Sequence, residues 1–296
     1  MRPPDPSVLY KSGDGYRRAM EAYDAMLAEL TLPYETHWVE TRHGLTHVIA
    51  AGTATAPAIA LWHGLSASAP TWVKQINAIA RAYRVYAVDI LGSMGKSSPA
   101  RLDRAGDAYG EWMADVLRGL KVERAHQIGI SHGGWLILKL AGVAPELITS
   151  AVLMSTAGFV RSRWQLFFKM LPILFMPRAH RGARFLQVMG APGIPPARQD
   201  LVLFDILMRD FKYEQIAGPL PDAALGRLTA PAYVLMGEYE AGFTPRAVVE
   251  RAKTVLPNLK KAEILAGVGH GMITENPKAV NERLLDFVGA QVQASS

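Results

Sequence analysis

The pentapeptide at residues 129–133, Gly-Ile-Ser-His-Gly, constrains this sequence more than any other feature. It has the form G-x-S-x-G, which places a serine, here Ser131, on a sharp turn between a strand and a helix. The two glycines leave room for the strained turn and for close packing of the helix on the strand. The flanks fit, because residues 125–130 are typical of a short buried strand and residues 134–144 of an apolar helix. The pattern predicts that Ser131 is a nucleophile.

A serine hydroxyl needs a base that accepts its proton and a third group that orients the base. With this type of turn the acid follows the serine in the chain, and the histidine follows the acid. His270 lies in a glycine-rich loop after a strand-like run at residues 261–265. The acid should follow the strand expected at residues 232–236, where Glu238 and Glu240 both stand. Because an extended chain turns both side chains to the same side, strand alternation leaves the two candidates open.

Strands and helices alternate from residue 58 onward, which predicts an α/β fold with a mainly parallel, doubly wound sheet and helices on both faces. A helix at residues 14–30 and a hairpin of residues 34–41 and 45–51 should precede this region. In such sheets the catalytic groups lie at the carboxyl ends of strands, and all the candidates follow strands. The expected strands cover residues 59–62, 85–90, 126–130, 150–154, 232–236 and 262–265.

Two further motifs complete an ordered set. His63-Gly64 follows the first of these strands, and the D-x-x-G sequence at residues 89–92 follows the second. Together with the serine, the acid and the histidine, they resemble the α/β-hydrolase superfamily over nearly the whole chain, and the bacterial serine carboxylesterases within it.

The resemblance implies roles for several residues. Glu240 stands three residues after a glycine, where most relatives carry an aspartate, so the resemblance implies Glu240 as the triad acid. The backbone amides of Leu65 and His132 are expected to stabilise the oxyanion. The side chains of His63 and Asp89 are expected to hold nearby loops and to take no part in the chemistry.

Residues 158–222 are too long for one crossover helix, and we interpret them as a helical cap inserted in a core domain of residues 1–157 and 223–296. Helices are expected at residues 164–171 and 200–211. The apolar residues of the cap are expected to wall a pocket for short to medium acyl chains. The run 164–176 could also dip into a membrane, but Lys169 and Pro172 interrupt it, and an apolar cap face lining an ester pocket explains it more simply. From residue 158 to residue 199 the sequence has seven Lys and Arg residues and no acid. The tentative pocket residues are Trp164, Phe167, Phe168 and Met272.

The composition excludes several classes of function. The 296 residues contain no cysteine, which rules out disulfides and thiol catalysis and fits a cytoplasmic protein. No run is apolar enough to predict a transmembrane helix or a signal peptide, so stable membrane insertion is not expected. The net charge of +6 comes without a nucleic-acid-binding motif, and His43 and His47 lack the partners of a zinc site. Neither a metal nor an organic cofactor is expected, and the oligomeric state is left open.

These observations predict a serine hydrolase that cleaves carboxylic esters, small molecules in solution, through a Ser131–His270–Glu240 triad and an acyl-enzyme. The first alternative is a hydrolase of carbon–carbon bonds in β-diketone-like substrates, which uses the same triad. An arginine of the cap facing the pocket would favour that alternative. The second is a binding protein of the same fold without catalysis, but such relatives typically lose the serine or the histidine.

Overall fold

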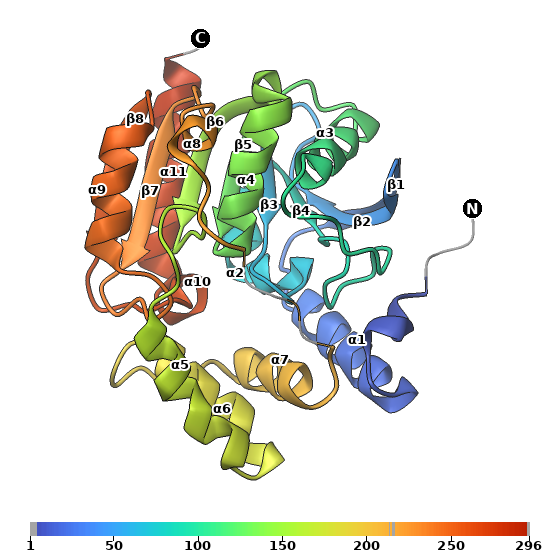
Figure 1. Cartoon of the computed structure of the whole chain (residues 1–296). Helices are drawn as coiled ribbons and strands as arrows, with labels where there is room; N and C mark the ends of the chain where they lie inside the picture. The colour runs from blue at the N-terminus through green and yellow to red at the C-terminus, as the bar shows by residue number, and fades with distance from the viewer. Residues whose placement is uncertain (1–4, 213, 215–216, 295–296) are drawn as a thin grey trace.

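The computed structural model describes residues 5–212, 214 and 217–294, so the first four residues of the polar N-terminus lie outside it. The described residues form an eight-stranded sheet in the order β1-β2-β4-β3-β5-β6-β7-β8 (Figure 1). The strands are β1 (Tyr34–Thr41), β2 (Gly44–Ala51), β3 (Ala58–Trp62), β4 (Arg84–Val88), β5 (Ala125–Ile130), β6 (Ile148–Met154), β7 (Ala232–Gly237) and β8 (Leu259–Leu265).

The sheet is mainly parallel, as predicted. Only the predicted hairpin departs from this direction among the described strands, since β1 pairs antiparallel with β2 and β2 pairs antiparallel with β4. The pairs β4–β3, β3–β5, β5–β6, β6–β7 and β7–β8 are all parallel. The carboxyl ends of these strands therefore meet at one edge of the sheet, where the loops carrying Ser131, Glu240 and His270 begin.

Helices cover both faces of the sheet, which confirms the doubly wound arrangement. On β3, Ile59 and Leu61 belong to the apolar core on one face, and Ala60 and Trp62 belong to the core on the other. The first core includes residues of α1 (Gly13–Leu27), α2 (Val73–Ile79) and α11 (Pro277–Gln293). The second includes residues of α3 (Ala108–Gly119), α4 (His132–Val143), α8 (Asp222–Leu225) and α9 (Pro245–Val255).

Residues 158–222, called the inserted segment below, connect β6 to β7. They contain α5 (Trp164–Met170), the short 3₁₀ helix η4 (Leu171–Phe175), α6 (Arg178–Met189) and α7 (Arg198–Arg209), which lie beyond the carboxyl ends of the parallel strands (Figure 1). Helices α5 and α7 match the sequence-based expectation, whereas α6 was not predicted. The rings of Phe185 and Phe204 stack at 5.0 Å and join α6 to α7.

The N-terminal residues hold the far end of the inserted segment. Lys11 donates its backbone N–H to the carbonyl oxygen of Asp210 (2.7 Å), and Lys212 donates its own to Leu9 (2.9 Å). The Arg18 guanidinium on α1 pairs with the Asp210 carboxylate at 2.7 Å. None of the described helices is long and apolar enough to span a lipid bilayer.

Candidate active site

Ser131 lies between β5 and α4 with a strained backbone. Its φ of 54° and ψ of −109° are rare for a residue with a side chain, and such strain persists only where neighbouring contacts hold it. The Ser131 N–H donates to the carbonyl oxygen of Met154 (2.8 Å), and the Ser131 carbonyl accepts the N–H of Ala157 (3.2 Å). The end of β6 and the loop after it therefore hold the turn that presents the hydroxyl.

The structure explains why glycines flank this serine. A Cβ atom on Gly129 would lie 2.4 Å from the backbone of Gly133, so helix and strand could not approach as closely. A Cβ atom on Gly133 would lie 1.9 Å from the carbonyl oxygen of Trp62. The two glycines of the motif are thus required by backbone contacts on both sides of Ser131.

His270 and Glu240 form a close pair in the loops after β8 and β7. The Nδ1 atom of His270 lies 2.8 Å from Oε2 and 3.0 Å from Oε1 of Glu240. The carboxylate is buried, with 1% of the residue exposed, and it also accepts the N–H of Gly242 at 2.7 Å. Because Nδ1 faces the carboxylate, the Nε2 atom of His270 is the one available for proton transfer.

Glu238, the other candidate acid, lies elsewhere. Its exposed carboxylate accepts the backbone N–H of Gly267 at 2.9 Å, so it fixes the start of the loop that carries His270. The chain turns after β7, where the Glu240 N–H donates to the carbonyl oxygen of Gly237 (3.3 Å). Strand alternation no longer applies past that turn, and the two glutamates separate.

The pair changes the acidity of both partners. Burial by itself would lower the pKa of His270, but the charge and hydrogen bond of Glu240, with a smaller effect of the Glu275 charge, raise this pKa above its ordinary value. Burial would raise the pKa of Glu240, but His270 holds it below the ordinary value. Glu240 therefore stays ionised at neutral pH and favours the protonated form of His270.

A second histidine, His132, follows Ser131 in the chain, and its side chain is buried. Burial lowers the pKa of the His132 imidazole to about 3. Neither of its ring nitrogens has a hydrogen-bond partner among the described residues, and the ring stacks on Trp135 at 5.4 Å. Among the described residues no carboxylate orients His132, whereas Glu240 orients His270.

The loop after β3 lies against Ser131. A Cβ atom on Gly64 would be 3.9 Å from the Cβ atom of Ser131. The His63 side chain is fully buried, donates from Nδ1 to the Gly64 carbonyl (2.8 Å) and accepts the Ile90 N–H at Nε2 (3.0 Å). This confirms that His63 holds the loop in place. Leu65, expected to supply an oxyanion amide, follows Gly64 in this loop.

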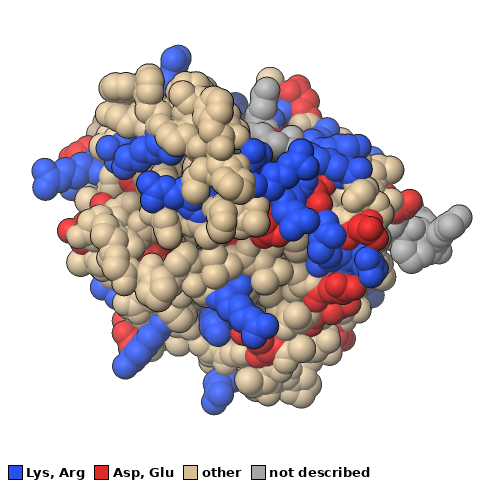
Figure 2. All heavy atoms as spheres, turned by 90° about the horizontal axis from the view of Figure 1, so that it is seen from below, with Lys and Arg blue, Asp and Glu red and all other residues tan. Residues whose placement is uncertain are grey.

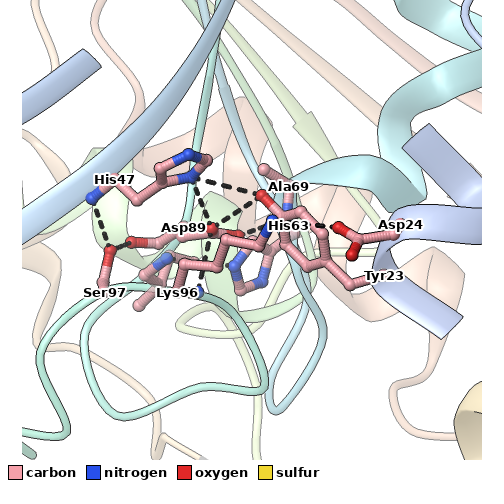
Figure 3. A network of polar contacts seen from close by, with 9 residues as sticks. Tyr23, Asp24, His47, His63, Ala69, Asp89, Lys96 and Ser97 are labelled. Carbon is pink, nitrogen blue, oxygen red and sulfur yellow. Dashed lines mark hydrogen bonds and ion pairs between the residues drawn. The ribbon is translucent and has the colours of Figure 1, made fainter. Parts of the chain in front are cut away.

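Asp89 anchors the same region from the centre of a network of polar contacts (Figure 3). Its buried carboxylate accepts the N–H groups of Ala69 (2.8 Å) and Lys96 (3.1 Å) and the hydroxyl of Tyr23 (2.9 Å). The Nδ1 atom of His47 lies 2.9 Å from the same carboxylate. The expected anchoring role of Asp89 is confirmed, and the network also ties α1 and β2 to the loop beside Ser131.

Ser131 and His270 line one cavity of about 210 Å³, and Leu65 and His132 line it as well. Most of its wall is apolar, and the inserted segment provides much of it. None of the described lining residues is Lys or Arg, whereas the carboxyl groups of Asp200 and Glu275 border the cavity. Burial, together with the charge of Glu275, raises the pKa of Asp200 above its ordinary value. The lining residues of the inserted segment include Leu166, Phe185, Leu186, Met189, Leu203, Phe204 and Leu207.

The four tentative pocket residues lie outside this lining, and the sequence-based expectation for them needs correction. Trp164, Phe167 and Phe168 are 68%, 64% and 59% exposed, because they share the outer face of α5 while Leu166 takes the inner face. Met272, at the start of α10 (Met272–Glu275), is fully buried in the core beneath the loop.

Sequence reasoning missed the wall formed by α6 and the role of Glu275. Phe185, Leu186 and Met189 have the spacing of one helix face, a signal in the sequence that could have identified this wall. The Glu275 carboxylate accepts the N–H of Gly269 (2.6 Å) and the N–H of Ala191 (3.3 Å). It thereby joins the loop of His270 to the end of α6.

The comparisons with known proteins agree with this geometry. The sequence model described as the Alpha/beta hydrolase family matches residues 59–283. Carboxylesterase YbfK of Bacillus subtilis (strain 168) is 32% identical over 302 residues, which cover 95% of this chain and 97% of that protein. The uncharacterized carboxylesterase nap of the same strain is 29% identical over 304 residues, which cover 98% of each chain.

A solved structure extends the agreement to three dimensions. The crystal structure of carboxylesterase CesB (YbfK) from Bacillus subtilis matches with a TM-score of 0.81 at 29% identity, over 93% of this chain and 98% of that one. The resemblance to bacterial carboxylesterases and the α/β-hydrolase fold expected from the motifs are both confirmed. On the evidence of the fold, the strained serine turn and the family match over most of its length, the chain belongs to the alpha/beta hydrolase family.

Proposed function

We propose that this protein is a serine carboxylesterase that hydrolyses esters of short to medium acyl chains through an acyl-enzyme. One observation carries the proposal. The His270 imidazole, held 2.8 Å from the buried Glu240 carboxylate, shares an apolar cavity with a serine on a strained strand-to-helix turn. The carboxylesterase relatives named above support the same reaction class.

In the proposed mechanism, the Ser131 hydroxyl attacks the ester carbonyl while Nε2 of His270 accepts its proton. Glu240 keeps Nδ1 protonated and stabilises the imidazolium as it forms. The backbone amides of Leu65 and His132 bind the negative oxygen of the tetrahedral intermediate. His270 then protonates the departing alcohol, and a water molecule activated by His270 releases the acid from Ser131.

The cavity favours small, uncharged acyl groups. Its volume of about 210 Å³ lies below the roughly 300–1,000 Å³ of common ligand pockets. In our proposal residues 158–222 form a cap, and the paired rings of Phe185 and Phe204 limit the depth of the acyl pocket. The carboxyl groups of Asp200 and Glu275 at its border disfavour substrates that carry a carboxylate.

The hydrolase of carbon–carbon bonds is the weaker alternative. This activity would need a cation in the pocket to bind the carboxylate of the substrate. The described lining contains no Lys or Arg. The seven cations between residues 158 and 199 therefore require an explanation other than substrate binding inside the cavity.

The test is hydrolysis of p-nitrophenyl acetate, butyrate, hexanoate, octanoate and palmitate. Each buried methylene contributes about 0.8 kcal/mol, so kcat/KM should rise about fourfold per methylene until the cavity is full and then fall. Ser131→Ala should lose activity on the order of 10⁴-fold or more. Ser162→Ala, which removes another hydroxyl from the cavity lining, is the matched control and should stay near the wild-type rate.

Two results would contradict the proposal. Retained hydrolysis by Ser131→Ala would exclude the serine as nucleophile. Undiminished activity on emulsified palmitate would exclude an enclosed pocket and favour a lipase with an open binding site.

A further inference from the structure

The outer surface of α5 and η4 is apolar and has no covering element among the described residues. Trp164, Phe167, Phe168 and Leu171 follow the three- and four-residue spacing of one helix face, yet this face points to solvent. Leu174 and Phe175 extend it with 63% and 84% exposure. We call these six residues the outer patch: Trp164, Phe167, Phe168, Leu171, Leu174 and Phe175.

Three rings of the outer patch pack against one another, and the other three residues of the patch follow them in the chain. The Phe168 ring packs edge-on against Trp164 at 5.5 Å and against Phe167 at 5.6 Å. The opposite side of the same segment is already occupied, because Leu166 lines the cavity and Ile173 is buried. A second large apolar face on a segment whose inner face is satisfied marks an interaction surface.

The residues around the outer patch are basic. Residues 158–199 contain seven Lys and Arg and no acid, and none of the seven forms an ion pair among the described residues. Lys169, Arg178 and Arg184 are exposed. Figure 2, which views the molecule from the side of the inserted segment, shows an uncharged surface bordered by Lys and Arg.

The backbone beneath the end of the outer patch is fixed. Arg181 donates from Nε to the carbonyl oxygen of Met176 (3.0 Å) and from Nη2 to that of Leu174 (2.8 Å). The exposed positions of Leu174 and Phe175 are thus held by hydrogen bonds from α6. The side chains of Leu174 and Phe175 therefore extend from a backbone that hydrogen bonds of Arg181 hold in place.

The charge pattern decides between the partners that an apolar surface can bind. A two-fold dimer through this face would bring the same basic border of each copy together, which costs repulsion. An anionic bilayer matches both features, because aromatic side chains insert at the headgroup level while Lys and Arg pair with acidic lipids. We propose that the outer patch and its basic border adsorb reversibly to anionic lipid surfaces.

This orientation has a consequence for substrate access. Adsorption through the outer face of α5 would hold the membrane against the same short helix whose inner residue Leu166 lines the cavity. Esters dissolved in the bilayer would then be concentrated beside the active site. That consequence rests on the proposed esterase function, whereas the adsorption itself does not.

The experiment is co-sedimentation of the full-length protein with vesicles of phosphatidylcholine alone or with roughly a third phosphatidylserine. The wild-type protein should bind the anionic vesicles, and binding should fall at about 1 M salt, where the Debye length is about 3 Å. Lys169→Gln with Arg178→Gln should weaken the partition coefficient by about fivefold for each cation removed. Leu174→Ser with Phe175→Ser should weaken it on the order of tenfold.

Matched controls separate adsorption from other effects. Tyr34→Ser removes an exposed aromatic residue from β1, outside the outer patch, and should bind as the wild type does. Ser131→Ala should also bind normally, and the Leu174/Phe175 variant should hydrolyse a soluble short ester at the wild-type rate. Failure of esterase activity would then be distinguishable from failure of adsorption.

Several results would overturn the proposal. Equal binding to neutral and anionic vesicles, or equal binding by all the variants, would exclude the outer patch and its charges as the lipid-binding surface. A wild-type dimer in light scattering that the Leu174/Phe175 variant converts to a monomer would assign this face to a second copy of the chain.

Discussion

At the scale of single residues, the proposed mechanism assigns different roles to the two glutamates after β7. Glu240 contacts His270, whereas Glu238 contacts only the backbone of the loop through Gly267. Glu240→Gln removes the charge that stabilises the imidazolium and should lower kcat by orders of magnitude. Glu238→Gln should reduce kcat less than tenfold, as judged from steady-state kinetics. A larger loss in Glu238→Gln would transfer the acid role to that residue.

The pH dependence follows from the shifted pKa of His270. The base must be neutral to accept the serine proton, and the Glu240 and Glu275 charges raise the pKa of His270 above its ordinary 6.5. The value of kcat/KM should therefore fall as the pH drops through an apparent pKa above 6.5 and should reach a plateau at higher pH. A pH profile whose acid limb lies well below that value would contradict the charge arrangement.

Glu275 offers a second test at the same scale, since it acts on His270 through the loop backbone and through its charge. Glu275→Gln keeps an oxygen that accepts the Gly269 N–H but removes the negative charge. The pKa of His270 should fall, so the acid limb of kcat/KM should move to lower pH. Glu275→Ala should in addition lower kcat. An unshifted limb in Glu275→Gln would show that the residue only supports the loop.

At the scale of elements, the proposed acyl pocket depends on the close approach of α6 and α7. A Cβ atom on Gly182 would lie 2.7 Å from the backbone nitrogen of Asp205, so Gly182→Val must separate the two helices. The stacked rings of Phe185 and Phe204 would move apart, and KM for butyrate esters should rise several-fold with a smaller change in kcat. Gly193→Val is a poor control, because Gly193 has open space around it but a positive φ that would strain any residue with a side chain. The better control is Gly218→Ala, where no atom lies within reach of the new Cβ and KM should not change.

The elements also show what the sequence could and could not predict. The alternation of expected strands and helices predicted the mainly parallel sheet. The G-x-S-x-G motif predicted the sharp turn at Ser131, because backbone contacts leave no room for a side chain at Gly129 and Gly133. Helical spacing marked the apolar face of Trp164, Phe167 and Phe168 but could not show whether that face turns inward or outward. The choice of Glu240 over Glu238 depended on a turn after β7, which strand alternation does not describe.

At the scale of the whole molecule, the inserted segment has two sides with different roles. Its inner side lines the cavity with Leu166 and Phe185, and its outer side carries the outer patch, with Lys169, Arg178 and Arg184 exposed in the same segment. The N-terminal helix α1 holds one end of it through Arg18 and Asp210, and Glu275 holds the end of α6. The segment proposed to limit the substrate is therefore also the segment proposed to meet the lipid surface.

The most direct test of the account is covalent labelling with a fluorophosphonate, followed by peptide mass spectrometry. The strained turn and the His270–Glu240 pair predict one adduct per chain on Ser131, loss of esterase activity in step with labelling, and no adduct in Ser131→Ala. The Ser162→Ala control should label as the wild type does. An active enzyme that resists the reagent, or an adduct on a residue other than Ser131, would contradict the assignment of Ser131 as the nucleophile.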